Sequence, residues 1–76
     1  MALALSSRLE AILFAAGESL SKARLAALLE VSPESVTDAC NALRITLADR
    51  GLTLVETEND IELRTVADAA EDIKKL

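Results

Sequence analysis

The spacing of apolar residues changes at Gly51, and this change constrains the fold more than any other feature of the chain. Before Gly51 the apolar residues recur with the period of an α-helix, and after it they alternate with the period of two typical of β-strands. Two alternating runs, 52–57 and 61–65, flank the polar turn Glu58-Asn59-Asp60. The sequence therefore predicts helices followed by a β-hairpin, with Asn59 adopting a positive φ in the turn.

Three helices are predicted before the hairpin, over residues 3–16, 22–29 and 33–50. Gly17 supplies the left-handed residue that ends the first helix, and Ser21 caps the start of the second. Ser32 and Pro33 form the clearest helix start in the chain, because serine caps the helix and proline fits its first turn. Gly51 is expected to end the third helix.

Each predicted helix carries one apolar stripe that is expected to face the core. These stripes are Leu5, Leu9, Ile12, Leu13 and Ala16, then Leu25, Leu28 and Leu29, then Val36, Ala39, Cys40, Leu43 and Leu47. Helical spacing returns after the hairpin, where Val66, Ala69, Ala70, Ile73 and Leu76 indicate a fourth helix.

The order of these elements predicts a winged helix. The second and third helices are joined by a turn of about three residues, as in a helix-turn-helix. The fold class is mainly α (α+β): a three-helix helix-turn-helix bundle, a two-stranded hairpin wing and a C-terminal helix. The hairpin must pack against the bundle, because two strands alone are not stable. The 76 residues form one domain over 1–76.

Charge argues against the usual role of this fold in reading DNA. The chain carries a net charge of −5, and no Lys or Arg occurs between Arg24 and Arg44, where the groove-reading helix would begin. Glu34 and Asp38 lie there instead, and the predicted wing is acidic as well. Both surfaces would repel phosphates, so we expect no direct DNA binding.

Nothing in the sequence indicates catalysis or a cofactor. The chain has no His, Tyr or Trp and no glycine-rich loop, so we expect no enzyme activity, no cofactor and no metal site. Four alternate carboxylates, Glu56, Glu58, Asp60 and Glu62, lack the glycine and the closing glutamate of a calcium loop. They are expected to mark the solvated side of the hairpin, with a basic patch on a partner as the alternative.

Cysteine use and hydropathy favour a cytoplasmic protein without a membrane segment. Cys40 is the only cysteine, so no internal disulfide can form, and its position on a core stripe predicts a buried, inert thiol. No apolar run approaches the 18 residues of a transmembrane helix.

Three apolar side chains point away from the predicted core. Phe14, the only aromatic residue, lies roughly 150° from the centre of its helix's stripe, Leu3 points the same way, and Ile45 lies about 160° from its stripe. Aromatic side chains are preferred anchors at protein interfaces. We therefore take Leu3, Phe14 and Ile45 as candidate interface residues. Burial within the monomer, under the fourth helix or Leu20, and plain exposure are the alternatives.

Three blocks of the sequence resemble one known family. The blocks LEAILFAAGESLS, LAALLEVSPESVTDACNAL and GLTLVETENDIELRT occur in order across residues 8–76 and resemble the N-terminal winged helix of bacterial segregation and condensation protein B. The chain departs from the family pattern at Ser19, where proline is usual, and at Ile61, where an aromatic residue is common. The turn Glu58-Asn59-Asp60 is also less rich in glycine than is usual.

The resemblance implies a non-enzymatic subunit of the bacterial SMC–kleisin condensin complex. Members of the family have two winged helices in tandem, so the chain is expected to be the first half of a longer protein. They form homodimers and bind the kleisin, and through it the SMC ATPase, in chromosome condensation and segregation. The location implied is the cytoplasm, in association with the nucleoid.

Two other functions stay open at this point. One is a fragment of a winged-helix transcription regulator whose DNA-binding surface lies in a C-terminal part of the protein. The other is an oligomerisation module of a different complex.

Overall fold

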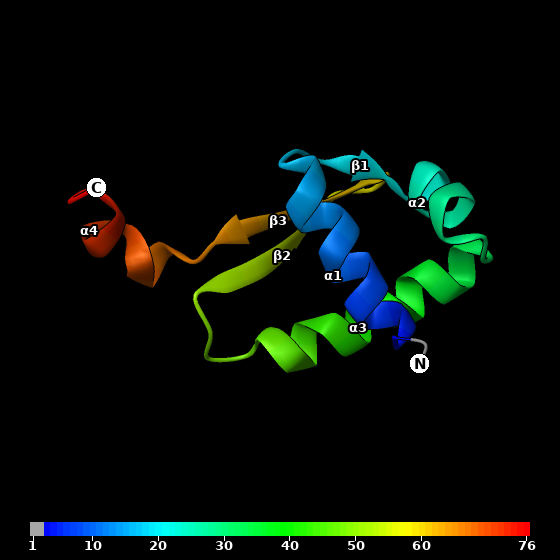
Figure 1. The fold of residues 1–76 in the computed structure, drawn as a ribbon, viewed down its shortest axis with the longest axis horizontal. Coiled ribbons are helices and arrows are strands. Elements are labelled where there is room, and N and C mark those ends of the chain that lie inside the picture. The colour runs from blue at the N-terminus through cyan, green and yellow to red at the C-terminus, as the bar shows by residue number, and fades with distance from the viewer. Residues whose placement is uncertain (1–2) are drawn as a thin grey trace.

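A computed structural model describes residues 3–76 and has the predicted architecture, three helices followed by a hairpin (Figure 1). The helices are α1 (Leu5–Ala16), α2 (Lys22–Leu29), α3 (Pro33–Leu47) and α4 (Ala70–Ile73), with a short 3₁₀ helix, η1 (Ala67–Ala69), before α4. The strands are β1 (Leu20–Ser21), β2 (Leu52–Glu56) and β3 (Asp60–Thr65). The winged-helix prediction is confirmed.

The core lies between the three long helices and one face of the hairpin. It contains every residue of the predicted α3 stripe together with two residues of the hairpin, Leu54 and Ile61. Its members are Leu9, Leu13, Leu25, Ala26, Leu29, Val36, Ala39, Cys40, Leu43, Leu47, Leu54 and Ile61. Leu28 was expected in the core, but it is 48% exposed. Ala26 is buried instead, together with Leu25 and Leu29 on the side of α2 that faces the core.

The predicted helix ends are confirmed at three positions. The Ser21 hydroxyl accepts a hydrogen bond from the Arg24 N–H at 3.0 Å, and the Ser32 hydroxyl accepts one from the Ser35 N–H at 3.1 Å. Gly17 ends α1 in the left-handed conformation with φ 66°, and its N–H donates to the Leu13 carbonyl. These local signals set where α2 and α3 begin, and so fix the helix-turn-helix.

The end of α3 differs from the prediction. The helix stops at Leu47 rather than near Arg50, and Gly51 does not supply the left-handed residue. That residue is Asp49, with φ 63°, in a turn that follows the last core side chain of the helix. Aspartate tolerates this conformation better than most residues, so the chain turns before it reaches the glycine.

The sheet has one strand more than predicted. Its order is β1-β3-β2, with both pairs antiparallel, and Leu20 lies opposite Ile61. In the turn between β2 and β3, the Thr57 hydroxyl accepts a hydrogen bond from the Asp60 N–H at 3.1 Å, and the Thr57 N–H donates to the Asp60 carbonyl at 2.9 Å. Because Thr57 closes the turn with these bonds, Asn59 does not need the positive φ that was predicted for it.

The C-terminal helix is shorter than the spacing of its apolar residues predicts. A 3₁₀ turn precedes the four residues of α4, and both project away from the bundle beyond the end of β3 (Figure 1). This projection contributes to the 40 Å length of the domain, against 27 Å and 19 Å in the other directions. None of the helices in residues 3–76 is long and apolar enough to cross a membrane.

Candidate protein interface

The three candidate interface residues are all exposed in the folded chain. Leu3 is 65% exposed, Phe14 74% and Ile45 79%. The helical period of α1 explains why the Phe14 side chain is exposed, because Leu9 and Leu13 are buried on the other side of that helix. The alternative that this domain itself buries Phe14 is therefore wrong.

Phe14 forms one wall of an open apolar notch. The notch lies between the outer side of α1 and the part of the hairpin that extends past the bundle, and it has a volume of about 390 Å³. We use the term apolar notch for the site lined by Ser7, Glu10, Ala11, Phe14, Leu52 and Leu63. Leu3 precedes α1, which begins at Leu5 and not at residue 3 as predicted, because Ala4 is extended with φ −59° and ψ 151°. The helical period therefore does not place Leu3 beside Phe14. Ile45 lies on α3 and does not line the notch.

The hairpin half of the notch was missed by sequence reasoning. The alternation of β2 and β3 correctly puts Leu52 and Leu63 on the face that also carries Leu54 and Ile61. Leu54 and Ile61 are buried, whereas Leu52 and Leu63 are only partly covered. The sequence shows which face each residue is on, but not how far the helices extend beneath the hairpin.

The helix-turn-helix surface is acidic, as its sequence indicates. Glu34 and Asp38 are exposed near the start of α3, and Asn41 is exposed one turn later. Arg44 is the first basic residue of α3, and its guanidinium is bound to the Glu56 carboxylate. No basic side chain of α3 before Arg44 is therefore available to phosphates.

Glu56 lies at the junction of three elements. Its carboxylate pairs with the Lys22 ammonium at 2.6 Å and with the Arg44 guanidinium. These ion pairs join β2 to the first residue of α2 and to α3. Hydrogen bonds from Lys22 and then from Arg44 hold the pKa of the Glu56 carboxyl below its usual value near 4.5. The prediction that Glu56 belongs to a solvated carboxylate series is therefore wrong, because its side chain is on the bundle side of the hairpin.

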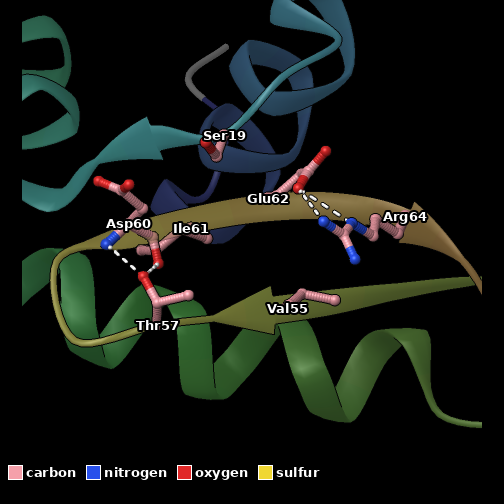
Figure 2. Close-up of a pocket in the computed structure, with 7 residues that line it drawn as sticks. All are labelled: Ser19, Val55, Thr57, Asp60, Ile61, Glu62 and Arg64. Carbon is pink, nitrogen blue, oxygen red and sulfur yellow. Dashed lines mark hydrogen bonds and ion pairs between the residues drawn. The ribbon is translucent and has the colours of Figure 1, made fainter.

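The outer face of the hairpin has a small polar hollow of about 130 Å³ (Figure 2). Figure 2 shows the Glu62 carboxylate paired with the Arg64 guanidinium at 2.9 Å on β3, with Val55 on the neighbouring strand. Thr57 and Asp60 close the turn at one end of the hollow. Glu62 is thus paired with Arg64, and Thr57 with Asp60. Within residues 3–76, no group of three or more His, Cys, Asp or Glu side chains could hold a metal ion.

Cys40 is buried, as predicted. Burial, together with the negative charge of Glu56, raises the pKa of the Cys40 thiol. A thiol that is both buried and protonated is a poor nucleophile. The exposed large apolar side chains outside this core are Leu3, Phe14, Leu28, Ile45, Ile73 and Leu76.

The chain is similar to one protein family and to a solved structure. The family described as segregation and condensation complex subunit ScpB matches residues 7–76. Among solved structures, a dimer of an ScpB N-terminal domain complexed with an ScpA peptide is similar to this chain, with 36% sequence identity and a TM-score of 0.84. The similarity covers 93% of this chain and 85% of that one. No curated protein matches the chain.

Proposed function

This chain belongs to the family of segregation and condensation complex subunit ScpB, and from that premise we propose that it is a subunit of a bacterial SMC–kleisin condensin complex. In this role it forms a homodimer and binds the kleisin, an ScpA-like protein. Through the kleisin it joins the SMC ATPase in chromosome condensation and segregation. The observation that carries the proposal is the similarity to an ScpB N-terminal domain that was solved as a dimer with an ScpA peptide.

The exposed apolar residues supply the contacts that this function needs. A subunit that binds both a second copy of itself and a kleisin requires more than one apolar surface. Leu3 precedes α1, Phe14 belongs to α1, and Ile45 belongs to α3. We assign all three to protein contacts, because large apolar side chains at the centre of an interface provide much of its binding energy.

The subunit is non-enzymatic in this proposal. Its only thiol is buried, and it has no histidine to act as a general base near neutral pH. Residues 1–76 form the first of two winged helices, and the protein acts in the cytoplasm, held at the nucleoid by the SMC complex. The acidic surface of α3 supports this indirect association with DNA over direct binding.

Affinity capture tests the proposal directly. The full gene product and the 76-residue chain are used as separate baits in nuclease-treated lysate of the source cells. We expect the full product to recover a kleisin and an SMC ATPase. Recovery of the kleisin by the shorter bait would locate part of the binding surface in residues 1–76.

The controls separate protein contacts from DNA contacts. Ile45→Ser is compared with Thr46→Ser, which changes the neighbouring exposed residue of α3 without removing a large apolar side chain. We expect weaker recovery of the kleisin or weaker dimerisation only for Ile45→Ser.

The nuclease treatment separates protein contacts from DNA contacts. If both baits recover no kleisin, and other proteins are recovered only when nuclease is omitted, the protein is a DNA-binding regulator and the proposal is wrong.

A further inference from the structure

We propose that α4 of one copy packs into the apolar notch of a second copy, and that two such reciprocal contacts form the homodimer. The inference deepens the proposed function and rests on it, because it requires the chain to dimerise. It follows from two apolar surfaces that this chain leaves uncovered and from the geometry of the segment between them.

The first surface is the apolar notch. Phe14 remains 74% exposed on one wall, while Leu52 and Leu63 are only partly covered on the other. A single exposed apolar side chain is common, but here an aromatic ring and two leucines from separate elements face one opening. The notch therefore has the dimensions and chemistry to receive apolar side chains of a short helix.

The second surface is the apolar side of the C-terminal segment. Ile73 is 39% exposed and Leu76 is fully exposed. Figure 1 shows α4 standing away from the bundle, so that none of α1, α2 or α3 covers it. Exposed apolar side chains on a projecting segment are stabilised when they pack against another apolar surface.

The backbone at Val66 directs α4 away from the notch of its own chain. The Val66 N–H donates to the Gly51 carbonyl at 3.0 Å, which extends the β2–β3 pairing by one position, and Val66 has an extended conformation with φ −76° and ψ 152°. To reach its own notch, α4 would have to reverse direction at this residue and break that bond. A second copy can receive α4 without any such change.

Two-fold symmetry makes the contact reciprocal. The notch includes Leu52 and Leu63 near the end of the hairpin from which α4 leaves, so an axis close to this end brings each α4 to the partner's notch. In such an isologous dimer every contact occurs twice. A standard interface covers about 800 Å² per protomer, roughly 15% of the 5318 Å² surface of this chain.

Two lysines of the segment can pair with an acidic residue of the notch. Glu10 lines the notch, and Lys74 and Lys75 lie between Ile73 and Leu76, whereas the acidic residues of the segment, Asp68, Glu71 and Asp72, all precede Ile73. These lysines have only exposed partners in their own segment, with Lys74 at 3.6 Å from Glu71 and Lys75 at 3.8 Å from Asp72. Exposed pairs of this kind contribute little, so the lysines can pair with Glu10 of a second copy.

Disulfide trapping between two differently substituted chains tests the proposal. Chains carrying Phe14→Cys are mixed with chains carrying Ile73→Cys and oxidised mildly. Native Cys40 is buried and stays unreactive under these conditions. We expect a cross-linked dimer of one chain of each kind. A matched mixture of Phe14→Cys with Glu71→Cys, on the opposite side of α4, should cross-link at least about tenfold less.

Dimer affinity provides a second measurement. Sedimentation equilibrium of the unmodified chain gives the reference value of the dimer Kd. Ile73→Lys and Phe14→Ala are each expected to raise the dimer Kd more than about tenfold, while Glu71→Gln, which makes the same charge change as Ile73→Lys, leaves it unchanged. Ile73→Lys and Phe14→Ala should not lower the melting temperature of the monomer, because the Ile73 and Phe14 side chains are exposed in it.

The outcomes distinguish this inference from the proposed function. If the unmodified chain dimerises but Phe14→Cys and Ile73→Cys do not cross-link, and Ile73→Lys leaves the Kd unchanged, the α4 contact is wrong and dimerisation stands. If Phe14→Ala lowers the melting temperature without changing the dimer mass, the notch is not an interface. If the unmodified chain is monomeric at millimolar concentration, both the inference and the proposed homodimer are wrong.

Discussion

Replacing Glu56 by glutamine removes the charge at the junction of the hairpin with α2 and α3. Glutamine keeps the length of the side chain and one acceptor oxygen, so the packing around it is retained. The Lys22 ammonium and the Arg44 guanidinium both lose their anionic partner. The substitution therefore tests how strongly this ion-pair cluster holds the wing to the bundle.

The expected cost follows from the exposure of the three side chains. The Glu56 side chain is 22% exposed, Lys22 27% and Arg44 40%, so the cluster is neither fully solvated nor buried. Exposed pairs contribute about 0.2–1 kcal/mol each, and two partly covered pairs that share one carboxylate should together contribute about 1–2 kcal/mol. For a domain of 76 residues, 1 kcal/mol corresponds to a fall of about 6 °C in Tm.

The pH dependence gives the test a distinct signature. The pKa of the Glu56 carboxyl is lower in the folded chain than in the unfolded chain. Its contribution to stability is therefore complete above the unfolded pKa, near 4.5, and is lost as the pH falls through the folded pKa. The unfolding free energies of the original chain and Glu56→Gln should differ at pH 7 and converge at lower pH.

Urea denaturation at fixed protein concentration measures both effects, because dimerisation makes stability depend on concentration. Glu58→Gln is the matched control, since it makes the same chemical change at an exposed turn residue. If Glu56→Gln costs no more than Glu58→Gln at pH 7, or if its deficit persists unchanged below the folded pKa, the ion pairs do not stabilise the wing and the reasoning is refuted.

Three further predictions concern the core and the helix start. Leu13→Ala should lower the free energy of unfolding by about 2–5 kcal/mol in urea denaturation, because it empties a fully buried site. Ser32→Ala should lower it by about 1 kcal/mol through loss of the α3 cap, whereas Ser19→Ala, in an exposed link, should change it little in the same assay. Cys40 should react with a thiol reagent only at the rate of unfolding, since its side chain is buried and its thiol pKa is raised; rapid reaction in native buffer would show that the core opens locally.

Local signals in the sequence were sufficient for most of the secondary structure. The Ser32 cap acts on an N–H only three residues away, and Gly17 ends α1 through a bond to Leu13. Interactions over so few residues depend little on the rest of the fold. The end of α3 was less predictable, because Asp49 and Gly51 can both adopt the left-handed conformation.

Long-range pairing was beyond these signals. Leu20 and Ser21 are too few to form a recognisable strand, and they count as β1 only because β3 lies beside them. Glu56 belongs to an alternating acidic run, yet its side chain is on the bundle side and meets Lys22 and Arg44. The partners that changed its role are 12 or more residues away in the chain.

The candidate interface divides in the same way. The sequence by itself determined that Phe14 and Ile45 point away from their own helices' core stripes, because a helix's period fixes the direction of every side chain around its axis. Only the tertiary structure decided that Leu52 and Leu63 complete an apolar notch beside Phe14 and that α4 projects away from it. Those features depend on how far separate elements extend past one another. That extent is set by the packing of the whole core and not by any local pattern.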